Sequence, residues 1–152
     1  MKQKYQIGKT DKDFIRFIKE KNGEEKDEKW LFGNLFQFNE GDFEKTDLFE
    51  MKYWTFKTTD NPDHELKVQR NATEYTFIIT GEIIGKVEAE KVNLKAGDYI
   101  IIKPGTVNNL VEKVIKDVIG ITIKTPSSQN DTVKIKKEFM RTELIEPTKN
   151  IG

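Results

Sequence analysis

Short apolar segments separated by turn signals fill residues 48–124, and this rhythm most constrains the fold. The segments alternate apolar and polar residues or consist of β-branched and aromatic ones, as in residues 99–102. The turns between them are rich in Gly, Pro, Asn and Asp, as in residues 60–63 and 95–98. Such spacing is typical of a β-sandwich or barrel, and because no helix-period segment interrupts it, it argues against a parallel α/β sheet.

The N-terminal part of the chain has a different pattern. Residues 11–21 carry apolar side chains at helical spacing, namely Phe14, Ile15, Phe17 and Ile18. They predict a short α-helix. The charged run at residues 24–29 predicts a solvent-exposed loop, and the aromatic-rich residues 30–38 predict a strand.

Length and composition limit the organisation and exclude several chemistries. A chain of 152 residues suits one domain. We expect residues 47–125 to form a barrel core, residues 1–46 to pack on it and residues 126–152 to extend it. The chain has no Cys and a single His, His64, which excludes disulfides, thiolate zinc sites and multi-histidine metal sites. Lys plus Arg and Asp plus Glu both number 26, so no basic excess favours nucleic acid or an anionic membrane.

The sequence offers no signal for export or for a membrane. No apolar run follows the first five residues, and no stretch approaches about 18 apolar residues. We therefore expect a cytoplasmic protein with no membrane segment.

Two groups of residues in the strand-rich part have the spacing of a known pair of motifs. In the first, Glu74 is followed after six residues by Gly81. In the second, Gly97 and Gly105 stand at the positions of two motif glycines, and Asn108 stands where the motif has its histidine. In these residues the chain resembles the cupins. The resemblance implies an all-β double-stranded β-helix, also called a jelly-roll barrel, with the short N-terminal helix added to it.

The resemblance also implies a metal site built from three His and one Glu, and the sequence departs from it. Of these ligands only Glu74 is kept, and Asn108 replaces the third His. The first two His positions fall on Lys67 and Gln69 or on Val68 and Arg70, depending on the length of the turn. An ammonium or guanidinium group is a poor metal ligand and repels a cation. We therefore expect no metal and no other cofactor.

The same positions predict a polar barrel interior that suits a small ligand. The candidate ligand-binding residues are His64, Lys67, Gln69, Arg70, Glu74 and Asn108. We expect the protein to bind a small polar ligand, either sugar-like or an organic acid, rather than to catalyse a reaction. One alternative is a metal-independent sugar or sugar-phosphate isomerase or epimerase, with Glu74 as the base and Tyr75, Lys67 or His64 as the acid. A second alternative is a structural module with an empty cavity.

Strand alternation predicts an apolar outer face. If Glu74 faces the interior, Thr76 and Ile78 face it as well, whereas Tyr75, Phe77 and Ile79 point outward. An apolar face of this kind requires a cover, which another sheet, the N-terminal aromatic segment or a second subunit would provide. We expect a homodimer, in keeping with the resemblance, since small cupins commonly dimerise.

Overall fold

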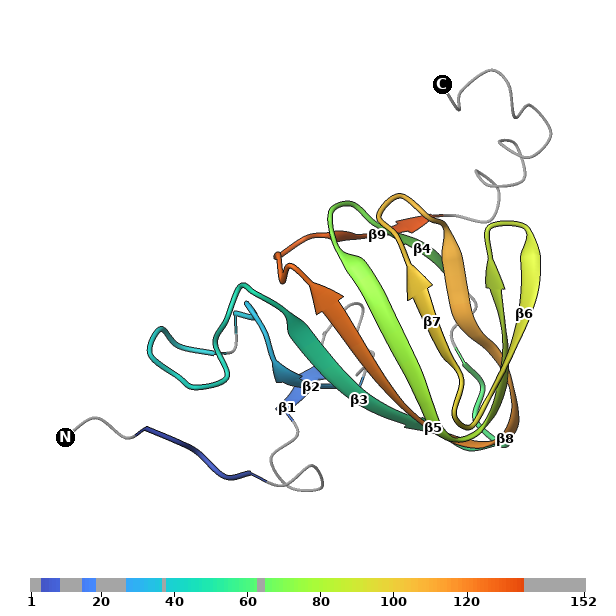
Figure 1. Ribbon diagram of the computed structural model, residues 1–152, viewed down its shortest axis with the longest axis horizontal. Coiled ribbons are helices and arrows are strands. Elements are labelled where there is room, and N and C mark those ends of the chain that lie inside the picture. The colour runs from blue at the N-terminus through green and yellow to red at the C-terminus, as the bar shows by residue number, and fades with distance from the viewer. Residues whose placement is uncertain (1–3, 9–14, 19–26, 37, 63–64, 136–152) are drawn as a thin grey trace, which may run out of the picture.

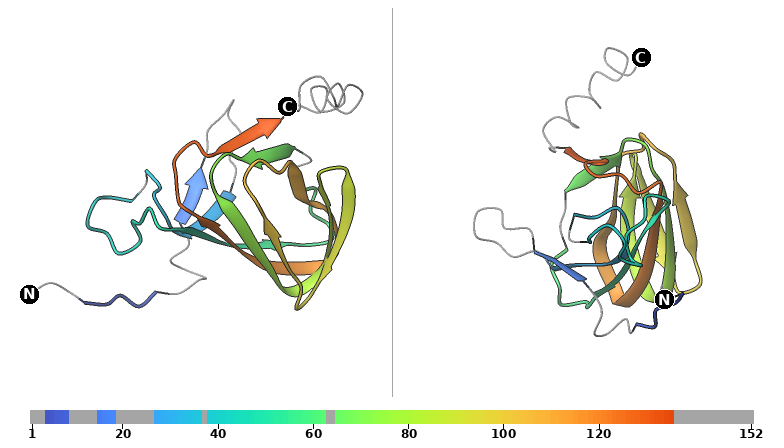
Figure 2. Two further views of the ribbon diagram at one scale, coloured as in Figure 1. Left: turned by 45° about the horizontal axis from the view of Figure 1, so that its top comes forward. Right: turned by 90° about the vertical axis from the view of Figure 1, so that its left-hand side faces the viewer.

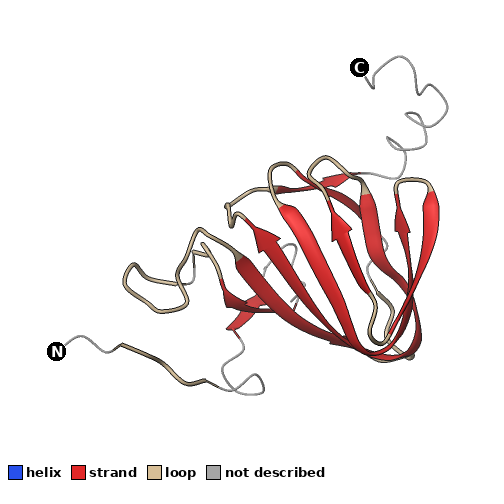
Figure 3. Ribbon diagram, in the orientation of Figure 1, coloured by secondary structure: helices blue, strands red, loops and turns tan. Residues whose placement is uncertain are grey.

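The fold is built from β-strands. The computed structural model describes residues 4–8, 15–18, 27–36, 38–62 and 65–135. Within these ranges the regular structure consists of nine strands, with no helix (Figures 1 and 3). The strands are β1 (Ile15–Ile18), β2 (Asp27–Phe32), β3 (Glu50–Phe56), β4 (Leu66–Gln69), β5 (Thr73–Val87), β6 (Glu90–Lys95), β7 (Tyr99–Ile102), β8 (Asn108–Thr125) and β9 (Thr132–Ile135). The expected all-β fold class is confirmed.

The nine strands form one antiparallel sheet that curls on itself. Its main path runs β1-β2-β3-β8-β4-β9. The long strand β5 pairs with β8, with β7 through its first half and with β6 through its second half. Figure 2 shows this sheet curling into an open barrel, with the two long strands forming much of its wall. The curl gives the sheet a concave inner face and a convex outer face.

The long strands bend where glycines remove side chains. Gly81 has a φ of +90°, and a Cβ built on it would lie 2.2 Å from the carbonyl oxygen of Asp117 on β8. A Cβ on Gly85 would lie 2.1 Å from the carbonyl oxygen of Leu110, also on β8. The register between β5 and β8 shifts around both glycines, as expected for β-bulges. The bends separate the half of β5 that carries Glu74 from the half that pairs with β6.

The helix expected over residues 11–21 is wrong in the part that the structure describes. Residues 15–18 form β1, which pairs antiparallel with β2 so that Ile15 lies opposite Trp30. Isoleucine and phenylalanine favour a strand once a neighbouring strand is present to pair with, and pairs of apolar residues fit either periodicity. The loop expected at residues 24–29 is also shorter than expected, because β2 begins at Asp27. Its residues 24–26 lie outside the described ranges.

The interior of the barrel has an apolar part and a polar part. The apolar core consists of Trp54, Ile78, Ile83, Leu94, Ile102, Leu110, Val114 and Val118. Buried polar residues on β3, β4, β5 and β8 are Glu50, Gln69, Glu74, Thr76, Asn108, Asn109, Thr122 and Lys124. The buried polar residues thus form a group that is distinct from the apolar core.

The outer face of the sheet is apolar where β7, β5, β8 and β3 lie side by side. Phe77 and Ile79 are 40% and 50% exposed, whereas Thr76 and Ile78, which alternate with them along β5, are 0% and 2% exposed. Tyr75 is half-buried on the same outer face. This confirms the predicted alternation along β5.

Among the described residues, no helix is long and apolar enough to cross a membrane.

Candidate functional site

Three charged side chains lie on one rung of the sheet, on the inner face. Lys124 of β8 is in register with Glu50 of β3 on one side and with Glu74 of β5 on the other. Glu50, Lys124 and Glu74 are 7%, 7% and 2% exposed. Burying charged groups costs free energy unless they are paired, and an ammonium between two carboxylates reduces that cost. This rung by itself carries two acidic groups and one basic group.

The next inward-facing pair along β5 and β8 consists of two threonines, Thr76 and Thr122, which lie between the charged residues and the apolar core. The hydroxyl oxygens of Thr76 and Thr122 are 2.9 Å apart, which is hydrogen-bond distance. The indole N–H of Trp54 donates to the Thr122 hydroxyl at 2.9 Å. A Cβ on Gly120 would lie 2.2 Å from the Trp54 ring, so the indole lies directly over this glycine. Trp54 therefore forms the apolar floor beneath the charged rung.

A second group of polar side chains joins the site from β4 and β9. Lys124 Nζ donates to the Thr132 hydroxyl at 3.4 Å, and that hydroxyl donates to Gln69 Oε1 at 2.8 Å. Gln69 is 1% exposed, whereas Thr132 is exposed to solvent. Asn108 is fully buried at the start of β8, where its Nδ2 donates to the carbonyl oxygen of Thr106 at 3.2 Å. The hydrogen bonds through Thr132 connect the charged rung to solvent at the β9 side.

Three buried polar atoms in this group lack a hydrogen-bond partner. They are Gln69 Nε2, Glu74 Oε2 and Asn108 Oδ1. Buried polar groups are almost always paired, and an unpaired one costs about 1–3 kcal/mol. One of the three is a donor and two are acceptors, so a bound molecule with both kinds of group would satisfy them.

Glu50 is a carboxyl group with a perturbed proton affinity. Burial raises the pKa of Glu50 above its ordinary value of 4.5, and the charges of Asp131 and Glu74 raise it further. The charge of Lys124 and a hydrogen bond from the Ser127 hydroxyl, 3.4 Å from Glu50 Oε1, act in the opposite direction. A carboxyl group with a raised pKa is suited to hold a proton and to donate a hydrogen bond.

Trp30 covers the charged rung from β2. It is 7% exposed and lies beside Lys52 of β3 in the sheet. Lys124 Nζ is 5.1 Å and Lys52 Nζ 5.6 Å from the centre of its ring, within cation–π range. The site thus has an aromatic wall whose face is occupied by two ammonium groups.

The structure brings three of the candidate ligand-binding residues into this group. Gln69, Glu74 and Asn108 are buried and each carries one of the unpaired atoms. Lys67 is half-buried on β4, in register with Asn108. Arg70 follows β4 and is exposed, so the inward pair is Lys67 with Gln69 and not Val68 with Arg70. His64 lies outside the described residues, and Tyr75 is on the outer face, away from Glu74.

Sequence reasoning missed Glu50, Lys124 and Thr132. A signal existed for the first two, since Glu50 is in phase with Trp54 on its strand, and Lys124 is in phase with Thr122. An ionisable residue on the inward phase of an apolar strand indicates a buried polar site. No such signal marked Thr132, because β9 lies outside the part of the chain that resembles the cupins.

The donor set does not fit the metal site of the cupins. Of the ligand types that such a site requires, the described residues offer only Glu74 at a motif position, and Lys124 is its neighbour in register. In the described part of the chain, no three His, Cys, Asp or Glu side chains are grouped to hold a metal ion. An ammonium group on the residue in register with this carboxylate repels a metal cation and is itself a poor metal ligand.

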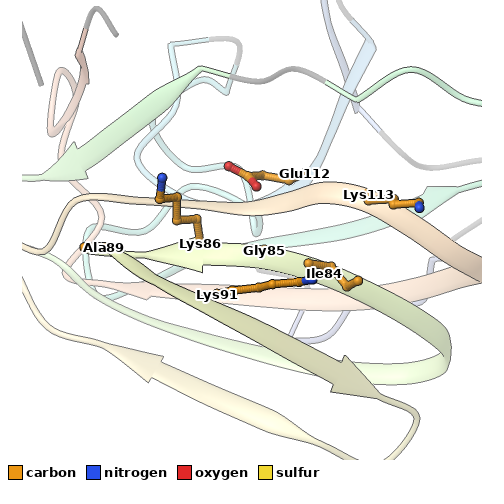
Figure 4. A pocket seen from close by; sticks show the side chains of 7 residues that line it. All are labelled: Ile84, Gly85, Lys86, Ala89, Lys91, Glu112 and Lys113. Atoms are coloured by element: carbon orange, nitrogen blue, oxygen red, sulfur yellow. The ribbon is translucent and has the colours of Figure 1, made fainter. Parts of the chain in front are cut away.

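A shallow pocket of about 640 Å³ lies elsewhere, on the outside of the barrel (Figure 4). It is lined by Ile84, Gly85, Lys86, Ala89, Lys91, Glu112 and Lys113, from β5, β6, β8 and the turn between β5 and β6. Ile84 and Lys86 are half-buried and alternate with Ile83, which is fully buried in the core. No lining residue carries an unpaired buried atom, so the barrel interior is the stronger candidate site.

Comparisons with known proteins place the fold. No protein-family model and no curated protein matches the sequence. Among solved structures, the chain is similar to a conserved protein with a double-stranded β-helix domain from Klebsiella pneumoniae, at 20% identity and a TM-score of 0.57, over 88% of this chain and 100% of the other. It is also similar to a variant of Streptomyces Pac13 solved with uridine, at 13% identity and a TM-score of 0.58, over 89% and 93% of the two chains. Pac13 is described as a nucleoside dehydratase. A protein from Planctomyces limnophilus matches at 11% identity and a TM-score of 0.56, over 84% and 95%.

These likenesses agree with the strand topology, and all three motif glycines, Gly81, Gly97 and Gly105, have positive φ. At such low identities they concern the fold and not the activity. The chain has the double-stranded β-helix fold of the cupins.

Proposed function

We propose that the protein binds a small, hydroxyl-bearing, sugar-like molecule at the polar end of its barrel interior. The observation that carries this proposal is the set of three unpaired buried atoms on Gln69, Glu74 and Asn108. A hydroxyl group both donates and accepts, so a polyol or sugar would satisfy two acceptors and one donor together. An organic acid fits less well beside Glu74, because on that rung two acidic residues, Glu50 and Glu74, flank the ammonium of Lys124.

The fold supports the same class of ligand by analogy. Pac13, whose fold this chain shares, has been solved with uridine, a ligand that carries ribose hydroxyls. This likeness is one of fold alone, so it guides the choice of probe and not the identification of the ligand.

The test is a titration of the purified protein followed by NMR chemical shifts. The probes are uridine, a set of neutral monosaccharides and a set of small carboxylic acids. We expect at least one hydroxyl-rich probe to give saturable shifts in residues of β4, β5 and β8. Glu74→Gln removes a charged acceptor from the site, and the loss of one hydrogen bond to a charged group, about 1.5–3 kcal/mol, weakens binding about 10-fold or more.

A matched variant controls for the change of charge. Glu90→Gln makes the same substitution at an exposed position of β6, and we expect the dissociation constant to stay unchanged. Saturable binding that is equally tight in wild type, Glu74→Gln and Glu90→Gln would place the ligand elsewhere. Binding of the carboxylic acids alone would overturn the preference for a sugar-like ligand.

A second candidate function is acid–base catalysis on a sugar or sugar phosphate. It is favoured by Glu50, a carboxyl group with a raised pKa that lies two strands from Glu74 on the same rung. Glu74 would serve as the base and Glu50 as the acid in place of the acids expected from sequence. The test is hydrogen–deuterium exchange at the carbon next to the carbonyl of aldose and ketose phosphates in D₂O. We expect Glu74→Gln to abolish any exchange, and an absence of exchange with all probes would leave binding as the function.

A further inference from the structure

The shallow pocket on the outside of the barrel is lined by three lysines, and we call it the lysine pocket (Figure 4). Lys86 of β5 lies directly opposite Lys91 of β6. Ile84, the preceding residue on the same face of β5, lies opposite Lys113 of β8. The register therefore brings one lysine from each of three strands to the outer face, and Figure 4 shows their side chains around Gly85.

The hollow lies at a β-bulge between β5 and β8. On one side of Gly85, Ile84 pairs with Lys113, and on the other side Lys86 pairs with Asn109. Three residues of β8 thus lie opposite the single residue Gly85. A Cβ on this glycine would lie 2.1 Å from a backbone carbonyl oxygen of β8, so no other residue allows the two strands to approach this closely. Bulges of this kind re-aim side chains and are frequent beside functional sites.

Ion pairs do not neutralise the ammonium groups of the lysine pocket. Within the described part of the chain, none of Lys86, Lys91 and Lys113 forms a salt bridge or a hydrogen bond through its ammonium group. The next outward carboxylate along β5, that of Glu82, instead accepts a hydrogen bond from Asn93 Nδ2 at 3.1 Å. Like charges directly opposite one another destabilise a sheet, and Lys86 and Lys91 are such a pair. An anion bound between them would reduce this repulsion.

We propose that the lysine pocket binds the phosphate group of a small phosphate monoester. Three ammonium groups and the carboxylate of Glu112 give the pocket a formal charge of two positive units. A phosphate monoester carries about −1.5 to −2 charges near pH 7, so the two charges match. Lysine is a common phosphate ligand, in which it acts as a point charge. The volume of about 640 Å³ lies within the range of small-molecule sites, roughly 300–1,000 Å³.

The remaining lining residues suit the organic part of such a ligand. Ile84 and Ala89 supply apolar contacts, and the Glu112 carboxylate accepts hydrogen bonds from a hydroxyl group. A nucleic acid fits less well, because it carries one charge per phosphate and the chain has no net positive charge to attract it. This inference does not depend on the proposed interior site, since that site lies on the other half of β5, with Glu74.

The test is a titration of the full chain followed by NMR chemical shifts, with inorganic phosphate, glucose 6-phosphate, glucose and citrate as probes. We expect millimolar glucose 6-phosphate to give saturable shifts in residues 84–91 and 112–113, and glucose to leave these residues unshifted. Lys86→Gln and Lys91→Gln should each weaken the binding about 3-fold, and both together about 10-fold. Glu112→Gln should tighten it about 3-fold, because it removes the negative charge from the pocket.

Two control variants separate this site from other effects of charge. Lys103→Gln makes the same substitution at an exposed lysine outside the pocket, and we expect the dissociation constant to stay unchanged. Glu74→Gln should also leave binding at the lysine pocket unchanged, so that failure of the interior site is distinguished from failure of this one. Circular dichroism confirms that each variant is folded.

The proposal is overturned if glucose 6-phosphate leaves the pocket residues unshifted, or if the pocket variants bind it as tightly as Lys103→Gln does. It is also overturned if inorganic phosphate, citrate or a short oligothymidylate binds the pocket more tightly than glucose 6-phosphate. The site would then take a free anion, a carboxylic acid or a nucleic acid.

Discussion

Gln69→Met should raise the stability of the free protein while it removes ligand binding. Gln69 is 1% exposed, its Nε2 has no partner, and its Oε1 accepts one hydrogen bond from the Thr132 hydroxyl at 2.8 Å. Methionine has nearly the same length and shape and leaves no buried polar atom. The substitution removes an unpaired donor that costs about 1–3 kcal/mol and loses a hydrogen bond worth about 1 kcal/mol. Because Thr132 is exposed, its hydroxyl then bonds to water at little cost.

The expected net gain is about 1 kcal/mol in the free energy of unfolding. For a chain of 152 residues this corresponds to a rise of about 2–4 °C in Tm. Urea denaturation, monitored by the fluorescence of the two tryptophans, measures the gain, and the titration with uridine and monosaccharides measures the loss of binding. Thr132→Val is the comparison variant. It removes the same hydrogen bond, together with the longer one from Lys124 Nζ at 3.4 Å, and leaves Gln69 with two unpaired groups. We expect Thr132→Val to lower the free energy of unfolding by about 1–3 kcal/mol.

Gln69→Met is expected to raise the free energy of unfolding and to weaken ligand binding, and these opposite changes are what tests the proposed site. A site that is kept ready for a ligand gives up stability for binding, so a variant that repairs it gains stability and loses the ligand. If Gln69→Met instead lowers stability by 1 kcal/mol or more and leaves ligand binding intact, the Nε2 group is paired in solution, for example by a buried water. The unpaired atoms would then be no argument for a ligand.

Three further predictions concern residues in or next to the candidate site. Burial raises the pKa of Glu50 in the folded protein. The stability that the protonated Glu50 carboxyl contributes is therefore complete below the unfolded pKa and is lost as pH rises through the folded pKa. Glu50→Gln removes this loss, so the increase that it causes in the urea midpoint should grow with rising pH. Gly120→Ala places a Cβ 2.2 Å from the Trp54 ring, and this overpacking should lower the free energy of unfolding by about 1–3 kcal/mol. The same substitution in a Trp54→Leu background should lower it by less, which a double-mutant cycle measured by urea denaturation would show. Asp131→Ala removes the carboxylate that accepts from both backbone N–H groups of residues 71–72, at 2.8 and 3.1 Å, and thermal unfolding should show a loss of about 2–4 kcal/mol.

The alternation along β5 could be predicted from sequence because a strand has only two faces. Once Glu74 was assigned to the interior, the side of every residue from Tyr75 to Ile79 followed, and the exposed fractions agree. The positive φ of Gly97 was equally accessible to sequence reasoning, because it is a local requirement of a turn. Gly81 lies inside β5, where the close approach of β8 leaves no room for a side chain. Local geometry therefore accounts for the fold class and for the alternation of the two faces, whereas the assignment of Glu74 to the interior came from the resemblance to the cupins.

The rest depends on contacts between distant parts of the chain. Lys124 joins Glu50 and Glu74 only because β8 lies between β3 and β5, and this order of strands has no signature within any one strand. Thr132 reaches Gln69 only because β9 pairs with β4, 63 residues away in sequence. The strand at residues 15–18 likewise needs β2 beside it, and without that partner its apolar pairs fit a helix equally well.

The alternation of β5 and β8 also means that two surfaces are encoded in one stretch of sequence, residue by residue. In the first half of β5, even positions such as Glu74 and Thr76 face the interior and odd positions such as Tyr75 and Phe77 face outward. After the bulge at Gly81 the phase is reversed, and the odd-numbered Ile83 is buried. Substitutions can therefore alter one surface while leaving the other's chemistry untouched. An insertion or deletion of one residue has no such freedom, because it would exchange the two surfaces along the remainder of the strand. We therefore expect insertions and deletions to be tolerated in the turns, and the strand bulges beside Gly81 and Gly85 mark the places within β5 where an extra residue is already accommodated.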